Sequence, residues 1–135
     1  MSTLERAIEI AARAHSAQFA PDGNPYILHP LRVMLTFPSP DERIAAVLHD
    51  VVEKSDDWPI SRLRREGFNK VVLQAIEALT KRPGEEFYDF VRRARQNDIA
   101  RNVKRADIND HLAYFPPGKN SEKYLPALTM LQDAA

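Results

Sequence analysis

Apolar residues recur along this chain at spacings of three and four, and no stretch alternates apolar with polar residues as an exposed β-strand would. This period places apolar side chains along one face of a helix. Prolines, glycines and capping residues divide the pattern into segments. We expect helices at about residues 3–19, 30–35, 40–54, 60–66, 68–81, 85–96, 98–114 and 121–132. The sequence therefore predicts a single compact all-α bundle of about seven or eight helices.

Two of the predicted helices begin with capping residues. Ser2 and Glu5 stand at capping-box spacing ahead of the first helix. Ser39 and Glu42 stand at the same spacing ahead of the third, with a proline in its first turn. We therefore expect the third helix to run without interruption to about Lys54.

The length and composition indicate one domain. A chain of 135 residues can bury about two thirds of its unfolded surface without a disulfide or a structural metal, so we interpret residues 1–135 as a single domain. The absence of cysteine excludes thiolate catalysis, zinc–thiolate sites and disulfides. No apolar run approaches membrane-spanning length, and the charged, amphipathic N-terminus is not typical of a signal sequence. We expect a soluble, cytoplasmic protein with no membrane partner.

The charges balance, with 19 Lys plus Arg and 19 Asp plus Glu. No global field therefore draws the protein toward nucleic acid. The basic run from Arg92 to Arg105 is typical of solvated helix faces. Phe87 and Phe90 stand on helical spacing that favours a role in the core. Nucleic-acid binding is thus the weakest hypothesis, and no pattern in the sequence indicates an oligomeric state.

Candidate chemistry begins with His49 and Asp50, which are adjacent within the apolar segment AAVLHDVVEK. Burying both without partners would be costly, and a bound metal would satisfy both. Capping, salt bridging or exposure to water explains this pair alone equally well. His29, at the N-terminal edge of the second helix, and Asp107 add a second imidazole and a second carboxylate. The four residues together could hold one divalent cation.

Glu53 follows His49 by four residues and Asp50 by three, so on one continuous helix the three side chains share an edge. Glu53 could then reach a water molecule bound to the metal. The alternative for Glu53 is a surface carboxylate that pairs with a neighbouring lysine.

Lys104 precedes Asp107 by one helical turn and His111 follows it by one turn, which places all three on one face. Lys104 could contact a substrate phosphate, and an ion pair with Asp107 or Asp110 is an equal alternative. Tyr26 is expected to fix the loop that delivers His29, and its ring could also stack on a base.

Five sequence blocks, in order, resemble the HD-domain metal-dependent phosphohydrolases, and within them small single-domain relatives of the RelA and SpoT type of alarmone (ppGpp) hydrolase. The resemblance covers most of the chain. The blocks are AIEIAARAHSAQ, GNPYILHPLRV, AAVLHDVVEKS, GFNKVVLQAIEALTKRPGEEFYDFVRRA and ARNVKRADINDHL.

The resemblance implies that His29, His49, Asp50 and Asp107 bind the metal and that Glu53 orients or deprotonates the water. Such relatives usually use manganese, and the mixed nitrogen and oxygen donor set also suits iron or zinc.

The chain departs from the alarmone hydrolases at three places around the pocket. Ala20 and Pro21 stand where those enzymes usually carry a basic pair, Lys54 stands where they carry a second acid, and His111 replaces an asparagine. The four metal positions are unchanged. This pattern favours a working hydrolase whose substrate is not necessarily ppGpp.

The sequence thus predicts a metal-dependent phosphohydrolase that acts on a nucleotide or another phosphorylated small molecule through a metal-bound water. One alternative is the ppGpp 3′-pyrophosphohydrolase activity of the resembling family, and another is a catalytically silent module that binds metal or nucleotide. The candidate substrate contacts, besides nearby arginines, are Lys104, Lys54, His111 and Tyr26.

Overall fold

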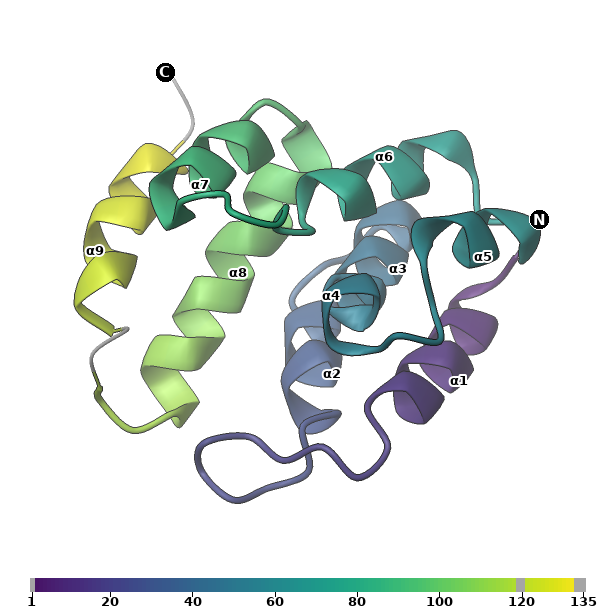
Figure 1. The fold of residues 1–135 in the computed structure, drawn as a ribbon, viewed down its shortest axis with the longest axis horizontal. Coiled ribbons are helices and arrows are strands. Elements are labelled where there is room, and N and C mark those ends of the chain that lie inside the picture. The colour runs from purple at the N-terminus through teal and green to yellow at the C-terminus, as the bar shows by residue number, and fades with distance from the viewer. Residues whose placement is uncertain (1, 119–120, 133–135) are drawn as a thin grey trace.

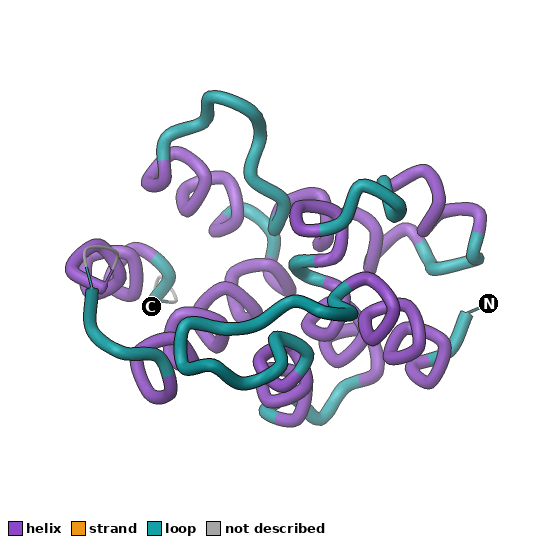
Figure 2. The backbone as a smooth tube through the Cα atoms, turned by 60° about the horizontal axis from the view of Figure 1, so that its bottom comes forward, coloured by secondary structure: helices purple, strands orange, loops and turns teal. Residues whose placement is uncertain are grey.

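The computed structural model describes residues 2–118 and 121–132. The helices in these ranges are α1 (Leu4–Ala14), α2 (Leu28–Leu35), α3 (Pro40–Leu48), α4 (Val51–Lys54), α5 (Ile60–Arg65), α6 (Lys70–Ala78), α7 (Phe87–Arg95), α8 (Asp98–Tyr114) and α9 (Ser121–Met130). Figure 2 shows these helices joined by loops, with no strand in the described ranges. The all-α prediction is confirmed.

The helix expected at residues 40–54 is interrupted, which is why the described residues form nine helices instead of seven or eight. α3 ends at Leu48, His49 is its C-cap, and Asp50 precedes α4. Consecutive residues on a regular helix point about 100° apart, so an unbroken helix would have turned these two side chains away from each other. The expectation that His49, Asp50 and Glu53 share one edge of a single helix is therefore wrong.

The first helix also differs from its predicted bounds. It ends at Ala14 instead of Phe19, and its N-cap is Thr3, whose hydroxyl accepts a hydrogen bond from the Arg6 amide at 3.1 Å. Ser2 instead donates its amide to the carbonyl of Gly67 at 3.0 Å, which removes it from the capping position. The predicted box of Ser2 and Glu5 is therefore wrong, because a tertiary contact replaced a local one.

The cap of α3 forms as predicted. The Ser39 hydroxyl accepts from the Glu42 amide at 3.4 Å and donates to the Glu42 carboxylate at 2.8 Å. This cap fixes the start of the helix whose far end carries His49.

α8 lies between two hydrophobic clusters. It packs against α2, α3 and α6 on one side, where most of the buried residues gather, and against α7 and α9 on the other. Figure 1 shows α8 crossing the molecule between these two groups of helices. The smaller cluster has four buried residues, which are Val91, Ile108, Ala127 and Leu131. Polar residues of α8 therefore lie at a junction between two packed units.

Among residues 2–118 and 121–132, no helix has the length and apolar character needed to span a bilayer.

Candidate metal centre

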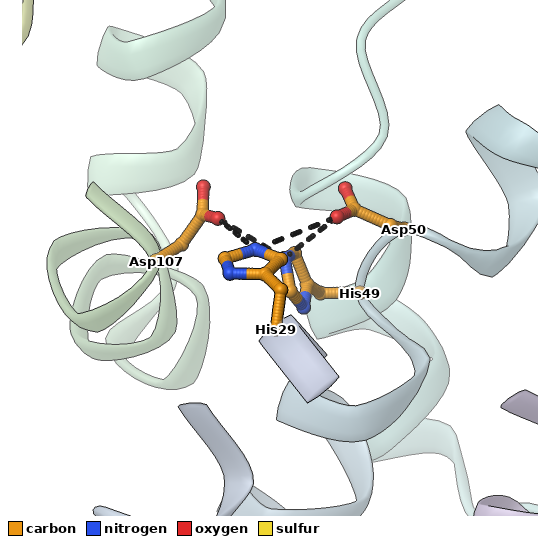
Figure 3. A group of neighbouring side chains, drawn as sticks. All are labelled: His29, His49, Asp50 and Asp107. Carbon is orange, nitrogen blue, oxygen red and sulfur yellow. Dashed lines mark hydrogen bonds and ion pairs between the residues drawn. The ribbon is translucent and has the colours of Figure 1, made fainter. Parts of the chain in front are cut away.

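Four side chains from distant parts of the sequence converge at the junction beside α8. His29 comes from the first turn of α2, His49 and Asp50 from the break between α3 and α4, and Asp107 from the middle of α8. One ligand atom from each lies within 4.8 Å of the others. Figure 3 shows the four side chains pointing toward one another. The grouping predicted from the sequence is therefore present in the fold.

The distances within this group suit a metal ion. Asp107 Oδ1 lies 2.8 Å from His29 Nε2 and 3.3 Å from His49 Nε2, and Asp50 Oδ2 lies 3.1 Å from His49 Nε2 and 3.8 Å from His29 Nε2. Metal bonds of about 2.0–2.2 Å to nitrogen and oxygen place neighbouring ligand atoms about 3.0–3.5 Å apart. The four ligand atoms thus need only small shifts to surround one ion.

The two imidazoles are also oriented as metal ligands are. His29 donates its Nδ1 proton to Asp110 Oδ2 at 2.6 Å, and His49 donates its Nδ1 proton to the carbonyl of Ala46 at 2.5 Å. With Nδ1 acting as donor on both rings, both Nε2 atoms can present a lone pair to the shared point. The donor set therefore fits a divalent transition metal.

The charges of the group balance within a buried space. Burial alone would lower the pKa of His29, but hydrogen bonds with Asp107 and Asp110 outweigh it and raise that pKa. Burial likewise opposes protonation of His49, yet Asp50 and Asp107 hold its pKa well above the usual value. Protons on the imidazoles offset the two carboxylates, and a divalent cation would supply the same compensation.

Lys104, Asp107 and His111 share one face of α8, as their spacing predicted. Lys104 Nζ lies 2.9 Å from Asp107 Oδ2, and His111 Nε2 lies 3.4 Å from Asp107 Oδ1. The ion pair considered as the alternative for Lys104 is therefore present. Burial opposes the charge of Asp107, but Lys104 and His49 hold the pKa of its carboxyl well below the usual range.

Tyr26 contacts a predicted ligand directly, because its hydroxyl donates to Asp50 Oδ2. Burial and the Asp50 carboxylate raise the pKa of Tyr26 well above its usual value, so its hydroxyl keeps its proton. The Tyr26 ring also lies 5.5 Å from the His29 ring and 5.0 Å from the His15 ring, measured between centroids. His15 is buried but lies outside the four-residue group, and its Nδ1 is 2.9 Å from Gln18 Oε1.

A cavity of about 690 Å³ adjoins the group, and Asp50 and Asp107 are part of its wall. Among the described residues that line it are four lysines, which are Lys54, Lys81, Lys104 and Lys123. Burial lowers the pKa of Lys123, and repulsion from the charges of Lys104 and Lys81 lowers it further. The cavity wall therefore carries four ammonium groups together with the carboxylates of Asp50, Glu53 and Asp107.

Lys81 and Lys123 were missed by sequence reasoning. Lys81 follows α6 in a loop, and Lys123 lies on α9, so neither belongs to a motif that pairs it with Asp107. Lys54 and Lys104, by contrast, were candidates from the sequence, and Lys54 Nζ lies 5.0 Å from the centre of the Tyr26 ring.

The arginines considered as substrate contacts do not line this cavity among the described residues. None of the residues that line this cavity is an arginine. Arg92 pairs with Asp89 at 2.6 Å, and Arg93 pairs with Glu85 at 2.9 Å. Both guanidinium groups thus form ion pairs with acidic residues that lie on α7 or just before it.

Glu53 lines the cavity, although the helix break alters its relation to His49. Its carboxylate accepts a hydrogen bond from the Lys81 amide at 2.9 Å, which ties α4 to the loop after α6. Of the positions that depart from the alarmone hydrolases, Pro21 and His111 also line the cavity, while Ala20 is buried.

The chain is similar in sequence to proteins that are named for acting on guanine nucleotides. The chain is 37% identical over 82 residues to a GTP pyrophosphokinase of Streptomyces coelicolor, with 58% of this chain and 9% of that protein covered. It is 35% identical over 82 residues to a guanosine-3′,5′-bis(diphosphate) 3′-pyrophosphohydrolase of Aquifex aeolicus, with 58% of this chain and 12% of that protein covered. No family model matches the chain.

A probable GTP pyrophosphokinase of Mycobacterium leprae aligns with 100% of this chain at 27% identity, and the aligned part is 19% of that protein. The chain thus spans between 9% and 19% of the length of these three relatives. The similarities confirm the predicted resemblance to the RelA and SpoT type of enzyme.

Proposed function

We propose that the protein is a metal-dependent phosphohydrolase that acts on a nucleotide or another phosphorylated small molecule. The observation that carries this proposal is the position of the four candidate ligands beside a cavity with four lysines. Imidazole and carboxylate groups that converge on one point suit a divalent cation, and converging ammonium groups suit phosphoryl oxygens. Relatives named for acting on guanine nucleotides support the same class of substrate.

The cavity wall can hold both parts of a nucleotide. Lys81, Lys104 and Lys123 supply cations for the phosphoryl groups. Phe87, Phe115 and Tyr124 line the same space and offer aromatic surfaces on which a base can stack. His111 lies between these two regions, because its imidazole contacts Asp107 and its ring centroid is 4.5 Å from that of Phe115.

Glu53 is the proposed general base. A divalent ion bound by the four ligands would lower the pKa of a water molecule and offset the negative charge that grows on the phosphoryl group. Glu53 then takes a proton from the attacking water as its oxygen bonds to phosphorus, and it can return that proton to the oxygen that leaves. Its hydrogen bond with the Lys81 amide holds the carboxylate at the cavity wall while leaving its other oxygen available.

Manganese is the proposed metal, with iron or zinc as alternatives, since the donor set contains two nitrogens and two carboxylates. A second candidate function is hydrolysis of the 3′-pyrophosphate of ppGpp, favoured by the name of the Aquifex aeolicus relative. The changes at Pro21, Lys54 and His111 lie in the cavity wall and argue for a different or broader substrate.

The test has two stages. The protein is purified without added metal, and its bound metals are measured by elemental mass spectrometry. Phosphate and pyrophosphate release is then assayed with Mn²⁺ on a panel of nucleotides that includes ppGpp, for the native protein and the Glu53→Gln variant. Stoichiometric metal with Glu53-dependent release supports the proposal. Metal without turnover of any compound would favour a silent binding module, and failure to bind any metal would refute the proposal.

A further inference from the structure

A buried carboxylate that is not among the four candidate ligands contacts the first of them. Asp110 lies one turn after Asp107 on α8, and the side chains of Asp110 and His29 are 7% and 0% exposed. Its Oδ2 accepts the Nδ1 proton of His29 at 2.6 Å. Asp110 was expected from the sequence only as a partner for Lys104, although its spacing of three from Asp107 places both on one helix face.

Arg32 also holds this carboxylate, through both of its oxygens. Its Nε donates to Asp110 Oδ1 at 2.8 Å, and its Nη2 donates to Asp110 Oδ2 at 2.9 Å. The guanidinium carbon also lies 4.1 Å from the centre of the Tyr114 ring. Because α2 carries both His29 and Arg32, and α8 carries Asp110, the fork fixes the carboxylate in one orientation.

This arrangement determines which nitrogen of His29 faces the other ligands. A fixed carboxylate beside Nδ1 keeps the proton there, so the lone pair is on Nε2, which lies 2.8 Å from Asp107 Oδ1. Partners of this kind orient metal-binding histidines, and their loss lowers metal affinity by about 10- to 100-fold.

We propose that Asp110, fixed by Arg32, is a positioning residue that holds the ring and tautomer of His29 for metal binding. The inference rests on the proposed metal site and assigns a role to two residues outside it. Neither residue needs to touch the metal or the substrate. For His49 the corresponding acceptor of the Nδ1 proton is the backbone carbonyl of Ala46.

The variants follow from this geometry. Asp110→Ala removes the acceptor, and Asp110→Asn keeps the shape but replaces one oxygen with an NH₂ group. An NH₂ group donates and cannot accept a hydrogen bond from either Arg32 or His29, and when it faces His29 it favours the tautomer with the proton on Nε2. Arg32→Met leaves the Asp110 carboxylate in place but removes the two hydrogen bonds that fix its orientation.

The matched control is another bidentate pair far from the cavity. Arg6 donates to Glu66 through Nε at 3.0 Å and through Nη2 at 2.7 Å, and neither residue lines the cavity. Glu66→Gln weakens a fork of the same kind without touching the site. Any general effect of losing such a pair on the fold should appear in this variant as well.

The experiment measures Mn²⁺ affinity by titration calorimetry, together with the melting temperature of the metal-free protein. We expect a loss of about 10- to 100-fold for both Asp110 variants, a smaller loss for Arg32→Met and native affinity for Glu66→Gln. The ¹⁵N chemical shifts of the His29 ring in the zinc-loaded protein provide a second readout. They should show Nδ1 protonated in the native protein and a disturbed pattern in Asp110→Asn, which a purely structural role would not produce.

Native affinity in a folded Asp110 variant would overturn the inference while leaving the proposed function intact. If both Asp110 variants fail to fold, the Arg32→Met variant provides the test. Native Mn²⁺ affinity together with unchanged ¹⁵N shifts of the His29 ring in that variant would overturn the inference. Absence of metal binding by the native protein would refute the proposed function and this inference together.

Discussion

Metal binding should raise the melting temperature of the protein, and His49→Gln should remove most of that increase. The ligands come from α2, the α3–α4 break and α8, so the unfolded chain does not hold them together. A metal that binds only the native state stabilises it by about 2.7 kcal/mol at a free concentration of 100 times Kd. The shift therefore reports the assembled site even if no substrate is known.

The size of the shift follows from the length of the chain. An unfolding entropy of about 2.1 cal/mol/K per residue, over 135 residues, gives about 0.28 kcal/mol/K. A stabilisation of about 2.7 kcal/mol thus corresponds to an increase of about 10 °C. If His49→Gln lowers metal affinity by about 100-fold, the same Mn²⁺ concentration stabilises the variant by only about 0.4 kcal/mol, or about 1–2 °C.

The assay is thermal unfolding followed by circular dichroism, with Mn²⁺ and with a chelator. His15→Gln is the control, because His15 is as deeply buried as His49 but is not among the four candidate ligands. It should lower the melting temperature under both conditions and keep the difference between them. A native-sized difference in His49→Gln would show that the metal binds elsewhere, and no difference in the native protein would refute the site.

Three other predictions concern separate groups. Glu53→Gln should keep the Mn²⁺-induced increase in melting temperature and lower turnover by about 100-fold or more, as measured in the phosphate-release assay; loss of the increase would contradict its role as base. Lys123→Met should raise the KM of the substrate by about 10-fold with bound metal unchanged, because it removes one charge from the cavity wall; an unchanged KM would place the phosphates elsewhere. Hydrogen bonds from Arg93 lower the pKa of Glu85 to about 2 from 4.5, so its stabilisation is present above pH 4.5 and is lost as the pH falls toward 2. Glu85→Gln should lower the melting temperature by about 3 °C at pH 7 and make no difference near pH 2.

Much of the fold could be predicted because helix periodicity and caps are local signals. The cap of α3 at Ser39 and the uninterrupted α8 follow from residues within a few positions of each other. The break at His49 and Asp50 could not be predicted in this way, since the segment AAVLHDVVEK has no glycine or proline. Asp50 instead accepts a hydrogen bond from the Tyr26 hydroxyl, and His49 Nε2 lies 3.3 Å from Asp107 Oδ1. Contacts with the loop before α2 and with α8 therefore replace the helical geometry at this break.

The ligand group could be predicted because its chemistry is unusual for its surroundings, whereas the cavity wall could not. His49 and Asp50 are polar residues inside the apolar segment AAVLHDVVEK, and such residues require partners. Lys81 and Lys123 belong to no motif in the sequence, and they reach the cavity only because the loop after α6 and the helix α9 are both packed beside α8. Composition and spacing carry no signal for that convergence.

The site lies at the junction of the two hydrophobic clusters, and this explains why the ligand group could be predicted from the sequence and the cavity wall could not. The ligands project from helices of the larger core, where burial fixes each side chain and leaves a trace in the sequence pattern. Lys123 and Tyr124 project from α9. Among the described residues, Ala127 on this helix and Leu131 just after it are buried in the smaller cluster. Substitutions in that cluster can reshape the cavity wall at Lys123 and Tyr124 while the four candidate ligands stay in place. Under the proposed function, we therefore expect substrate preference to diverge among related chains more readily than metal binding, which agrees with altered residues around four unchanged candidate ligands.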